Sequence, residues 1–138
     1  MAEVERFSYL KITNSVGDPT LIPRLPITLS SNHRTVQTTG LLDSGSQINL
    51  LPYQMGLDLG AVWKPELAVI RLSGNLARYP ACGLAAYARV GKLNSVRLAF
   101  AWVQTDEVGL ILGQMNFFME FDICFFRSQQ AFEIRPKS

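Results

Sequence analysis

The sequence predicts a single all-β domain, either a barrel or a sandwich. Short runs of aromatic, branched and other apolar residues recur along residues 1–138, and clusters of Gly, Pro, Asn, Asp and Ser separate them. Several runs alternate apolar with polar side chains, as a strand does when one of its faces joins a core. Residues 114–121 are the best candidate for a helix, of about two turns. Many short strands with almost no helix are typical of barrels and sandwiches.

The first part of the chain predicts three strands in succession. Residues 7–13 are rich in aromatic and branched side chains and end at a turn cluster. Residues 25–29 and 35–42 predict a hairpin, because the polar segment 30–34 joins two runs of strand character. The second strand of this hairpin leads directly to Asp43.

After Asp43 the sequence predicts a short strand and then a second hairpin. Residues 48–51 form a mainly apolar run. Residues 54–59 are a poor helix, because a glycine lies within them and another follows. Residues 67–72 alternate apolar with polar side chains, and residues 76–79 return from a turn centred on Gly74. Gly74 is either a simple hairpin turn or the tip of a mobile segment.

The C-terminal part predicts two more hairpins and one central strand. Residues 83–90 and 96–102 alternate and are joined by a turn, so we expect them to pair. Residues 108–113 are continuously apolar, which is typical of a strand buried on both faces. Residues 123–126 and 132–134 predict the final hairpin.

The composition argues against several classes of partner. The net charge is +2, and the 13 Lys and Arg residues are dispersed, whereas a nucleic-acid binder would cluster them. No run of about 18 apolar residues occurs, so we expect no membrane span. Residues 1–14 lack the apolar core of a signal peptide. We therefore expect a cytoplasmic protein, although a membrane-anchored parent protein would fit the same sequence.

The cysteines and the histidine predict neither a metal site nor a catalytic nucleophile. Cys82 and Cys124 have neither the pattern of a disulfide scaffold nor the spacing of a CxxC metal site. We expect both to be reduced thiols packed in the core. His33 is the only histidine and lies in a polar turn, so we expect no zinc site and no Ser-His-Asp triad. The sequence predicts no cofactor.

Residues 41–51 place a lone carboxylate between two apolar runs. Asp43 is the only charged side chain between Thr35 and Leu57. Gly45 lets the backbone turn sharply, and Ser44 can steady the turn by a local hydrogen bond. Asp43 therefore either caps this turn or takes part in chemistry.

The order of these segments resembles the retropepsin-like aspartic proteases, which occur in retroviruses and as single-domain bacterial proteins. The resemblance rests on the triplet Asp43-Ser44-Gly45 after the apolar pair Leu41-Leu42 and on Ile111-Leu112-Gly113 near the C-terminus. Between them, the hairpin at Gly74 is similar to the flap of that family. The resemblance covers about residues 20–136. It implies a closed β-barrel with a flap hairpin and one short C-terminal helix.

The resemblance also implies a function, a homodimeric aspartic endopeptidase. The chain has one Asp-Ser-Gly triplet, so a working site takes one Asp43 from each of two copies. The two carboxylates share one proton; one activates water and the other protonates the scissile carbonyl oxygen of a peptide substrate. The supporting residues implied are the active-site loop of Ser44, Gly45 and Ser46, the flap residues Leu72, Ser73, Gly74 and Asn75, and the buried segment Ile111, Leu112 and Gly113. By the same resemblance, the terminal segments 7–13 and 132–136 are candidates for the dimer interface.

One departure from the family leads to a separate expectation. Retroviral members pair an acid after the triplet with an Arg after the apolar-apolar-Gly segment, and here these positions are Gln47 and Gln114. We expect a neutral amide pair in place of the salt bridge, in which case Gln114→Arg alone destabilises the fold. Two alternatives to the enzyme remain open: a non-catalytic β-module of the same fold that binds a peptide or partner, and a monomer whose site does not assemble.

Overall fold

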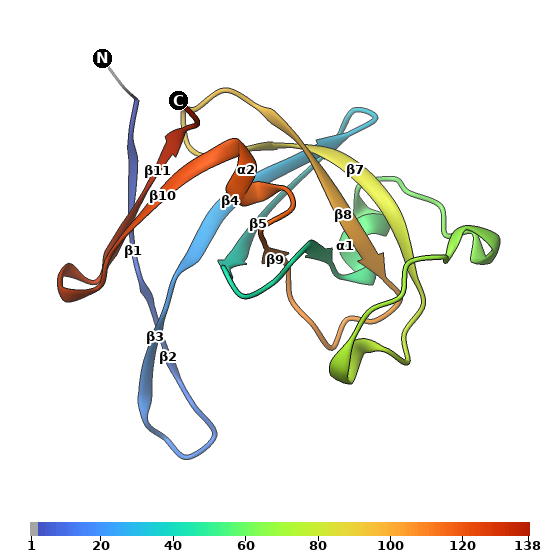
Figure 1. Cartoon of the computed structure of the whole chain (residues 1–138), viewed down its shortest axis with the longest axis horizontal. Helices are drawn as coiled ribbons and strands as arrows, with labels where there is room; N and C mark the ends of the chain where they lie inside the picture. The colour runs from blue at the N-terminus through green and yellow to red at the C-terminus, as the bar shows by residue number, and fades with distance from the viewer. Residues whose placement is uncertain (1–2) are drawn as a thin grey trace.

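The structure, a computed structural model, describes residues 3–138, and six of its strands form a closed barrel (Figure 1). The strands follow one another around the barrel in the order β4-β5-β9-β6-β8-β7. Their bounds are β4 (Arg24–Ser31), β5 (Arg34–Leu42), β6 (Asn49–Leu51), β7 (Ala81–Arg89), β8 (Val96–Val103) and β9 (Ile111–Leu112). The predicted all-β class and the closed barrel are confirmed.

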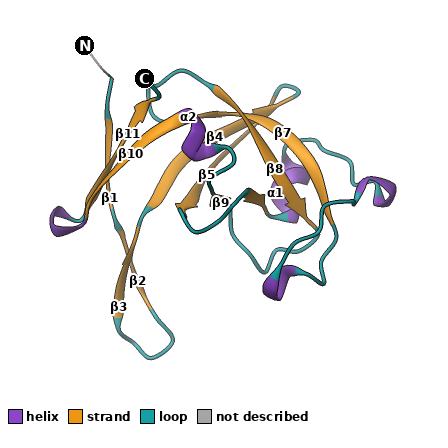
Figure 2. Ribbon diagram, in the orientation of Figure 1, coloured by secondary structure: helices purple, strands orange, loops and turns teal. Residues whose placement is uncertain are grey.

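Two smaller sheets accompany the barrel (Figure 2). One has three strands in the order β1-β11-β10, and the other is the hairpin β2–β3, which projects away from the barrel (Figure 1). Their bounds are β1 (Glu5–Ser8), β2 (Leu10–Thr13), β3 (Pro19–Ile22), β10 (Phe121–Phe126) and β11 (Ala131–Pro136), and the turn η3 (Arg127–Gln129) joins β10 to β11. The predicted final hairpin is confirmed. Because β11 lies between β1 and β10, both of its edges are paired within the chain.

The hairpins predicted for the barrel are also confirmed. Strands β4 and β5 pair from Arg24 with Leu41 to Ser31 with Arg34, and β7 pairs with β8 in the same antiparallel manner. Only Asn32 and His33 separate β4 from β5, and their φ angles are 47° and 68°. Positive φ at both central residues is what a type I′ turn requires, and this turn suits the natural twist of a hairpin.

Alternate side chains of the long strands fill the interior of the barrel. Full burial of a Leu, Ile or Phe side chain stabilises a fold by about 1.5–3 kcal/mol, which sets the inward register of each strand. The buried positions of β4, β7 and β8 that follow this alternation are Leu25, Ile27, Leu29, Ala86, Ala88, Leu98, Phe100 and Trp102. Leu110 and Leu112 are buried as well, as the continuous apolar run predicts.

Residues Tyr53–Asp58 form the helix α1, although the sequence disfavours a helix there. The reason is a tertiary contact. A Cβ atom at Gly56 would lie 2.2 Å from the indole ring of Trp102. The absence of that atom lets the indole pack on the helix and donate its Nε1–H to the Tyr53 carbonyl at 3.0 Å. This packing outweighs the cost of a glycine in a helix, about 1 kcal/mol.

The C-terminal helix α2 (Phe117–Glu120) is half as long as predicted. The N–H groups of Gln114 and Met115 donate to the carbonyls of Ser46 and Gln47, both at 2.9 Å. These bonds tie the first residues of the predicted helix to the turn after β5, so the helix begins later. Within residues 3–138, no helix has the length and apolar character needed to cross a membrane.

The predicted hairpin around Gly74 is wrong. Residues 67–79 contain no strand, and Ile70 makes only an isolated bridge to Ala81. The segment contains the 3₁₀ turn η2 (Gly74–Leu76), and η1 (Pro65–Leu67) precedes it. The N–H groups of Ala77 and Tyr79 donate to carbonyls three residues earlier, at 3.2 and 3.0 Å. These local bonds replace the cross-strand bonds that a hairpin needs. We call residues 70–79 the 70–79 loop.

Candidate active site

Asp43 lies where β5 runs parallel to β9. Leu41 pairs with Ile111, and Leu42 pairs with Leu112. The Asp43 N–H donates to the Leu112 carbonyl at 3.0 Å, which extends this pairing by one residue. The Asp43 side chain is half-buried. The two apolar segments that the sequence singles out are therefore side by side, and together they hold Asp43.

The backbone after Asp43 folds back onto its carboxylate. The Gly45 N–H donates to Asp43 Oδ1 at 2.9 Å, and the Ser46 N–H donates to the Asp43 carbonyl at 3.1 Å. A hydrogen bond to a carboxylate oxygen is charge-assisted when the acid is ionised. The turn thus fixes the orientation of the carboxylate through one of its oxygens. The Ser46 hydroxyl donates to the Ile48 carbonyl at 2.8 Å and steadies the far side of the turn.

Gly113 packs directly against this turn. A Cβ atom at Gly113 would lie 2.3 Å from the Ile48 carbonyl oxygen and 2.7 Å from that of Ser46. Both contacts are to backbone, which cannot swing aside as a side chain can. Only glycine therefore fits at this position, and the predicted apolar-apolar-Gly segment owes its glycine to this close approach.

Asn49 is a site residue that the sequence did not single out. It is 0% exposed and is a buried polar residue of the barrel core. Asn49 Oδ1 accepts the Gly113 N–H at 2.8 Å, and Asn49 Nδ2 donates to the Ala99 carbonyl at 3.0 Å. A polar residue inside the apolar run 48–51 was the one available signal, because a buried amide needs partners.

Asn116 completes the same network and was also missed. Its Oδ1 accepts from Asn49 Nδ2 at 3.2 Å and from the Ala99 N–H at 3.0 Å. Its Nδ2 donates to the Arg97 carbonyl at 3.2 Å. The two amides join β6, β8 and the residues after Gly113, so the scaffold behind Asp43 is held by directional bonds as well as by packing.

The expected amide pair between Gln47 and Gln114 is replaced by another contact. Gln114 Nε2 donates to the Ser44 carbonyl at 2.8 Å. Gln47 contributes its backbone, whose carbonyl accepts the Met115 N–H at 2.9 Å. The side chain of Gln114 therefore braces the Asp-Ser-Gly turn directly, and a backbone carbonyl takes the place of the second side chain.

A pocket of about 420 Å³ opens beside the turn. Several predicted residues meet in it, because the active-site loop and the 70–79 loop both line this cavity. Among its lining residues are Gly45, Ser46, Ile48, Leu72, Ser73 and Ile111. Leu112 and Gly113 are buried behind the pocket, whereas Gly74 and Asn75 are exposed on η2 and do not line it.

The end of the 70–79 loop is tied to the loop that precedes β9. The Tyr79 hydroxyl donates to Glu107 Oε2, and Arg78 makes an exposed ion pair with the same carboxylate at 3.5 Å. Arg78 Nη2 also donates to the Tyr79 hydroxyl at 2.8 Å, and this hydrogen bond, more than the charge of Glu107, raises the pKa of Arg78 above its usual value. These contacts anchor one end of the 70–79 loop, which lines the pocket.

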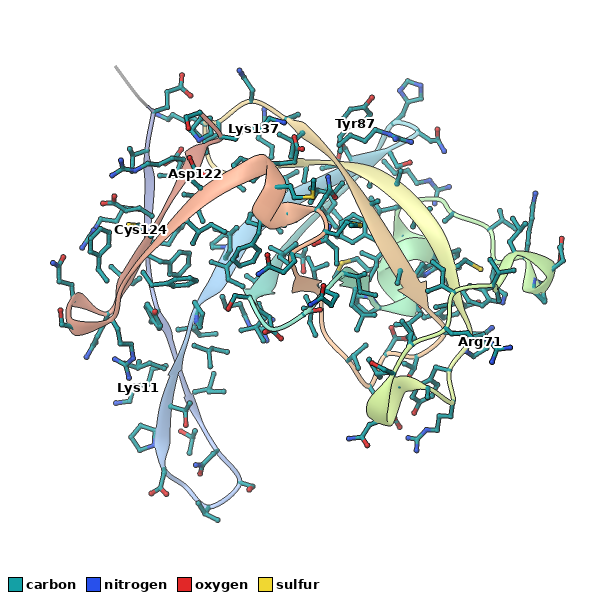
Figure 3. The ribbon with its side chains drawn as sticks, viewed as in Figure 1. Lys11, Arg71, Tyr87, Asp122, Cys124 and Lys137 are labelled. Carbon is teal, nitrogen blue, oxygen red and sulfur yellow. The ribbon has the colours of Figure 1, made fainter. Side chains whose placement is uncertain are left out.

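Both cysteines are free, but only one is packed as expected. Cys82 is buried, and burial, together with the charge of Glu66, raises the pKa of its thiol. A thiol with a raised pKa holds its proton and is a poor nucleophile. Cys124 is exposed on β10 (Figure 3), so the prediction of a packed thiol is wrong there. It follows Ile123, whose side chain is partly buried against the core, and neighbouring residues of a strand point to opposite faces.

Comparisons with known proteins show a likeness in structure only. No protein-family model and no curated relative matches the chain. A crystal structure of a retropepsin-like aspartic protease from Rickettsia conorii matches 99% of this chain and 94% of its own, with a TM-score of 0.63 and 16% sequence identity. EIAV protease in complex with the inhibitor HBY-793 matches 75% of this chain and 88% of its own, with a TM-score of 0.52 and 14% identity. The chain therefore has a retropepsin-like fold.

Proposed function

We propose that this chain is an aspartic endopeptidase that works as a homodimer with one Asp43 from each copy. The observation that carries the proposal is the setting of Asp43. Its half-buried carboxylate lies between two buried segments of a retropepsin-like barrel, on a turn held by Gly45 and by Gln114, beside a pocket. A simple turn cap needs none of the surrounding bracing, which supports a role in chemistry.

The reaction is hydrolysis of a peptide bond by two carboxylates that share one proton. The ionised Asp43 takes a proton from water, and the water oxygen attacks the scissile carbonyl carbon. The protonated Asp43 of the other copy donates its proton to the carbonyl oxygen, which gives a neutral diol. The C–N bond then breaks as the leaving nitrogen takes a proton from the first Asp43, and the second recovers a proton from the diol. The pair ends with one proton, as it began.

The turn serves this reaction by holding the acid still. The Gly45 N–H keeps Asp43 Oδ1 oriented before a substrate arrives, so little reorganisation is needed at the moment of reaction. Ser44 is exposed in the single chain. In the proposed dimer its hydroxyl is free to hydrogen-bond across to the partner's turn and to brace the pair.

The substrate that the pocket favours is an extended peptide with apolar side chains. Ile48, Leu50, Leu72 and Ile111 supply apolar lining, and the Gly45 backbone offers hydrogen bonds to an added strand. We assign the contacts of the 70–79 loop with substrate to Leu72 and Ser73, which line the pocket. Gly74 and Asn75 are exposed and lie outside the pocket, so in this proposal they contact the substrate only if the 70–79 loop moves.

The test is a peptide-library digestion with the wild-type chain, Asp43→Asn and the control Asp122→Asn. Asp122 is an exposed acid on β10 and lies outside the pocket (Figure 3). We expect cleavage by the wild type and by Asp122→Asn, and none by Asp43→Asn. Cleavage that persists in Asp43→Asn contradicts the proposal. Peptide binding without cleavage by the wild type would instead identify a non-catalytic binding module.

A further inference from the structure

The hairpin β2–β3, which we call the arm, exposes apolar side chains that the rest of the described chain leaves open. Leu10 is 45% exposed, Ile12 is 40% exposed, and Val16 at the tip is 77% exposed. The arm is a two-stranded sheet of its own. Such a hairpin is marginally stable in water unless it packs on something else. The arm therefore has the features of a surface that a partner covers.

The two faces of the arm differ in character. Leu10 pairs with Ile22 across the hairpin, so these side chains and that of Ile12 share one face. Lys11 and its cross-strand partner Leu21 lie on the opposite face. Figure 3 shows Lys11 pointing away from the barrel, on the outer side of the arm. The apolar face consequently points inward, toward the space that the arm and the barrel flank together.

The arm begins beside the candidate active site. Pro23 directly follows β3, and its carbonyl accepts the N–H of Leu42 at 3.1 Å. Leu42 immediately precedes Asp43. In Figure 1 the arm projects beyond the margin of the barrel on which the chain between β5 and β6 turns. A protein molecule that approaches Asp43 from this side therefore contacts the apolar face of the arm.

We propose that the arm clasps a second copy of this chain and packs its Leu10–Ile12 face on that copy. This proposal rests on the proposed function, in which a second copy of the chain must approach Asp43 to supply the second carboxylate. The C-terminal strand β11 is paired on both edges, so the second copy cannot add a strand directly to β11, and the arm is left as a surface for it. In a two-fold dimer the arm packs twice, once from each copy.

The experiment is sedimentation equilibrium of the full chain and of Ile12→Glu, over a range of concentrations. Because each dimer carries the substitution twice, we expect the dimer dissociation constant to rise by about 100-fold or more. The control Val62→Glu adds the same charge at a side chain that is 74% exposed and away from the arm, and it should leave the constant unchanged. An unchanged constant in Ile12→Glu overturns the proposal.

Folding and function are checked separately. Thermal melting at fixed low concentration should show that Ile12→Glu and the milder Ile12→Ser keep the barrel, and Ile12→Ser should weaken the dimer less. If the wild type is a dimer but cleaves no peptide, the proposed proteolytic function is wrong, and sedimentation of Ile12→Glu still tests the arm. If the wild type is monomeric at every concentration, the arm proposal fails. If Ile12→Glu raises KM for a peptide and leaves the dimer intact, the arm binds substrate and the proposal is wrong.

Discussion

Asn49 accepts the backbone N–H of Gly113 at 2.8 Å, and this hydrogen bond joins two segments that are 64 residues apart in the chain. The segment before Asn49 carries the Asp43 turn, and the segment before Gly113 is β9. A fully buried side chain therefore fixes the distance between the two halves of the candidate site.

Asn49→Leu keeps nearly the same volume but removes the polar atoms. We expect a loss of about 2–4 kcal/mol in the free energy of unfolding, because the Gly113 N–H is left buried without a partner and the Ala99 carbonyl loses a donor. Urea denaturation measures this loss. Ser46→Ala, which removes a single hydrogen bond of the turn, should cost only about 1 kcal/mol. Equal midpoints for Asn49→Leu and the wild type would show that the network is unimportant.

Gly113→Ala introduces a methyl group where backbone oxygen atoms already lie. We expect a loss of about 3 kcal/mol or more, because the new Cβ would lie 2.3 Å from the Ile48 carbonyl oxygen. Gly83→Ala is the matched control, since its Cβ would meet nothing nearer than the Ile70 side chain at 3.9 Å. Thermal melting of the two variants should differ clearly. Similar melting temperatures would contradict the close approach at Gly113.

Gln114→Ala removes the side chain that braces the Asp-Ser-Gly turn. Loss of the bond to the Ser44 carbonyl should cost about 1 kcal/mol of stability. Gln114→Arg keeps a donor for that carbonyl, so we expect it to be close to the wild type. From the sequence alone, we expect the Gln47 side chain to be the partner of Gln114 and Gln114→Arg to destabilise the fold, so the two expectations are opposite. If denaturation curves show that Gln114→Arg is as unstable as Gln114→Ala, the expectation from the sequence is the correct one.

The attachment of β1 should depend on pH through Glu133. Hydrogen bonds from Arg135 and then Arg6 lower the pKa of Glu133 in the folded chain. Its contribution is therefore complete above the pKa of an unfolded Glu and is lost as the pH falls through the lower, folded-state pKa. We expect the protection of the β1 amides against hydrogen exchange, measured relative to the intrinsic exchange rate at each pH, to fall over that acidic range. In Glu133→Gln this fall in protection should disappear, and an unchanged pH profile of protection in this variant would exclude Glu133 as the cause.

The sequence was most informative where periodicity and turn chemistry act locally. The hairpins β4–β5, β7–β8 and β10–β11 follow from runs of strand character joined by turn signals, and the short apolar strand at residues 111–112 follows from a continuous apolar run. These features need no knowledge of distant contacts. The setting of Asp43 beside residues 111–113 is different, because the resemblance to the retropepsin-like family implied it and no local rule of sequence did.

The sequence failed where a contact between distant residues decides the outcome. Gly56 is tolerated in α1 because Trp102 packs against it, and no local rule contains that contact. Asn49 looked like an ordinary polar residue because its partners lie 50 or more residues away. The turn at Gly74 was correctly placed, but local 3₁₀ hydrogen bonds prevented the strands of a hairpin from forming.

The central claim, that each active site needs two copies of Asp43, is tested most directly by subunit mixing. Wild-type chain and Asp43→Asn are mixed at a constant total concentration, allowed to exchange, and assayed for peptide cleavage. If both carboxylates are required, activity falls with the square of the wild-type fraction, to about one quarter at equal amounts of the two chains. Activity that falls in direct proportion, to about one half, would show that one chain is sufficient and would contradict the claim.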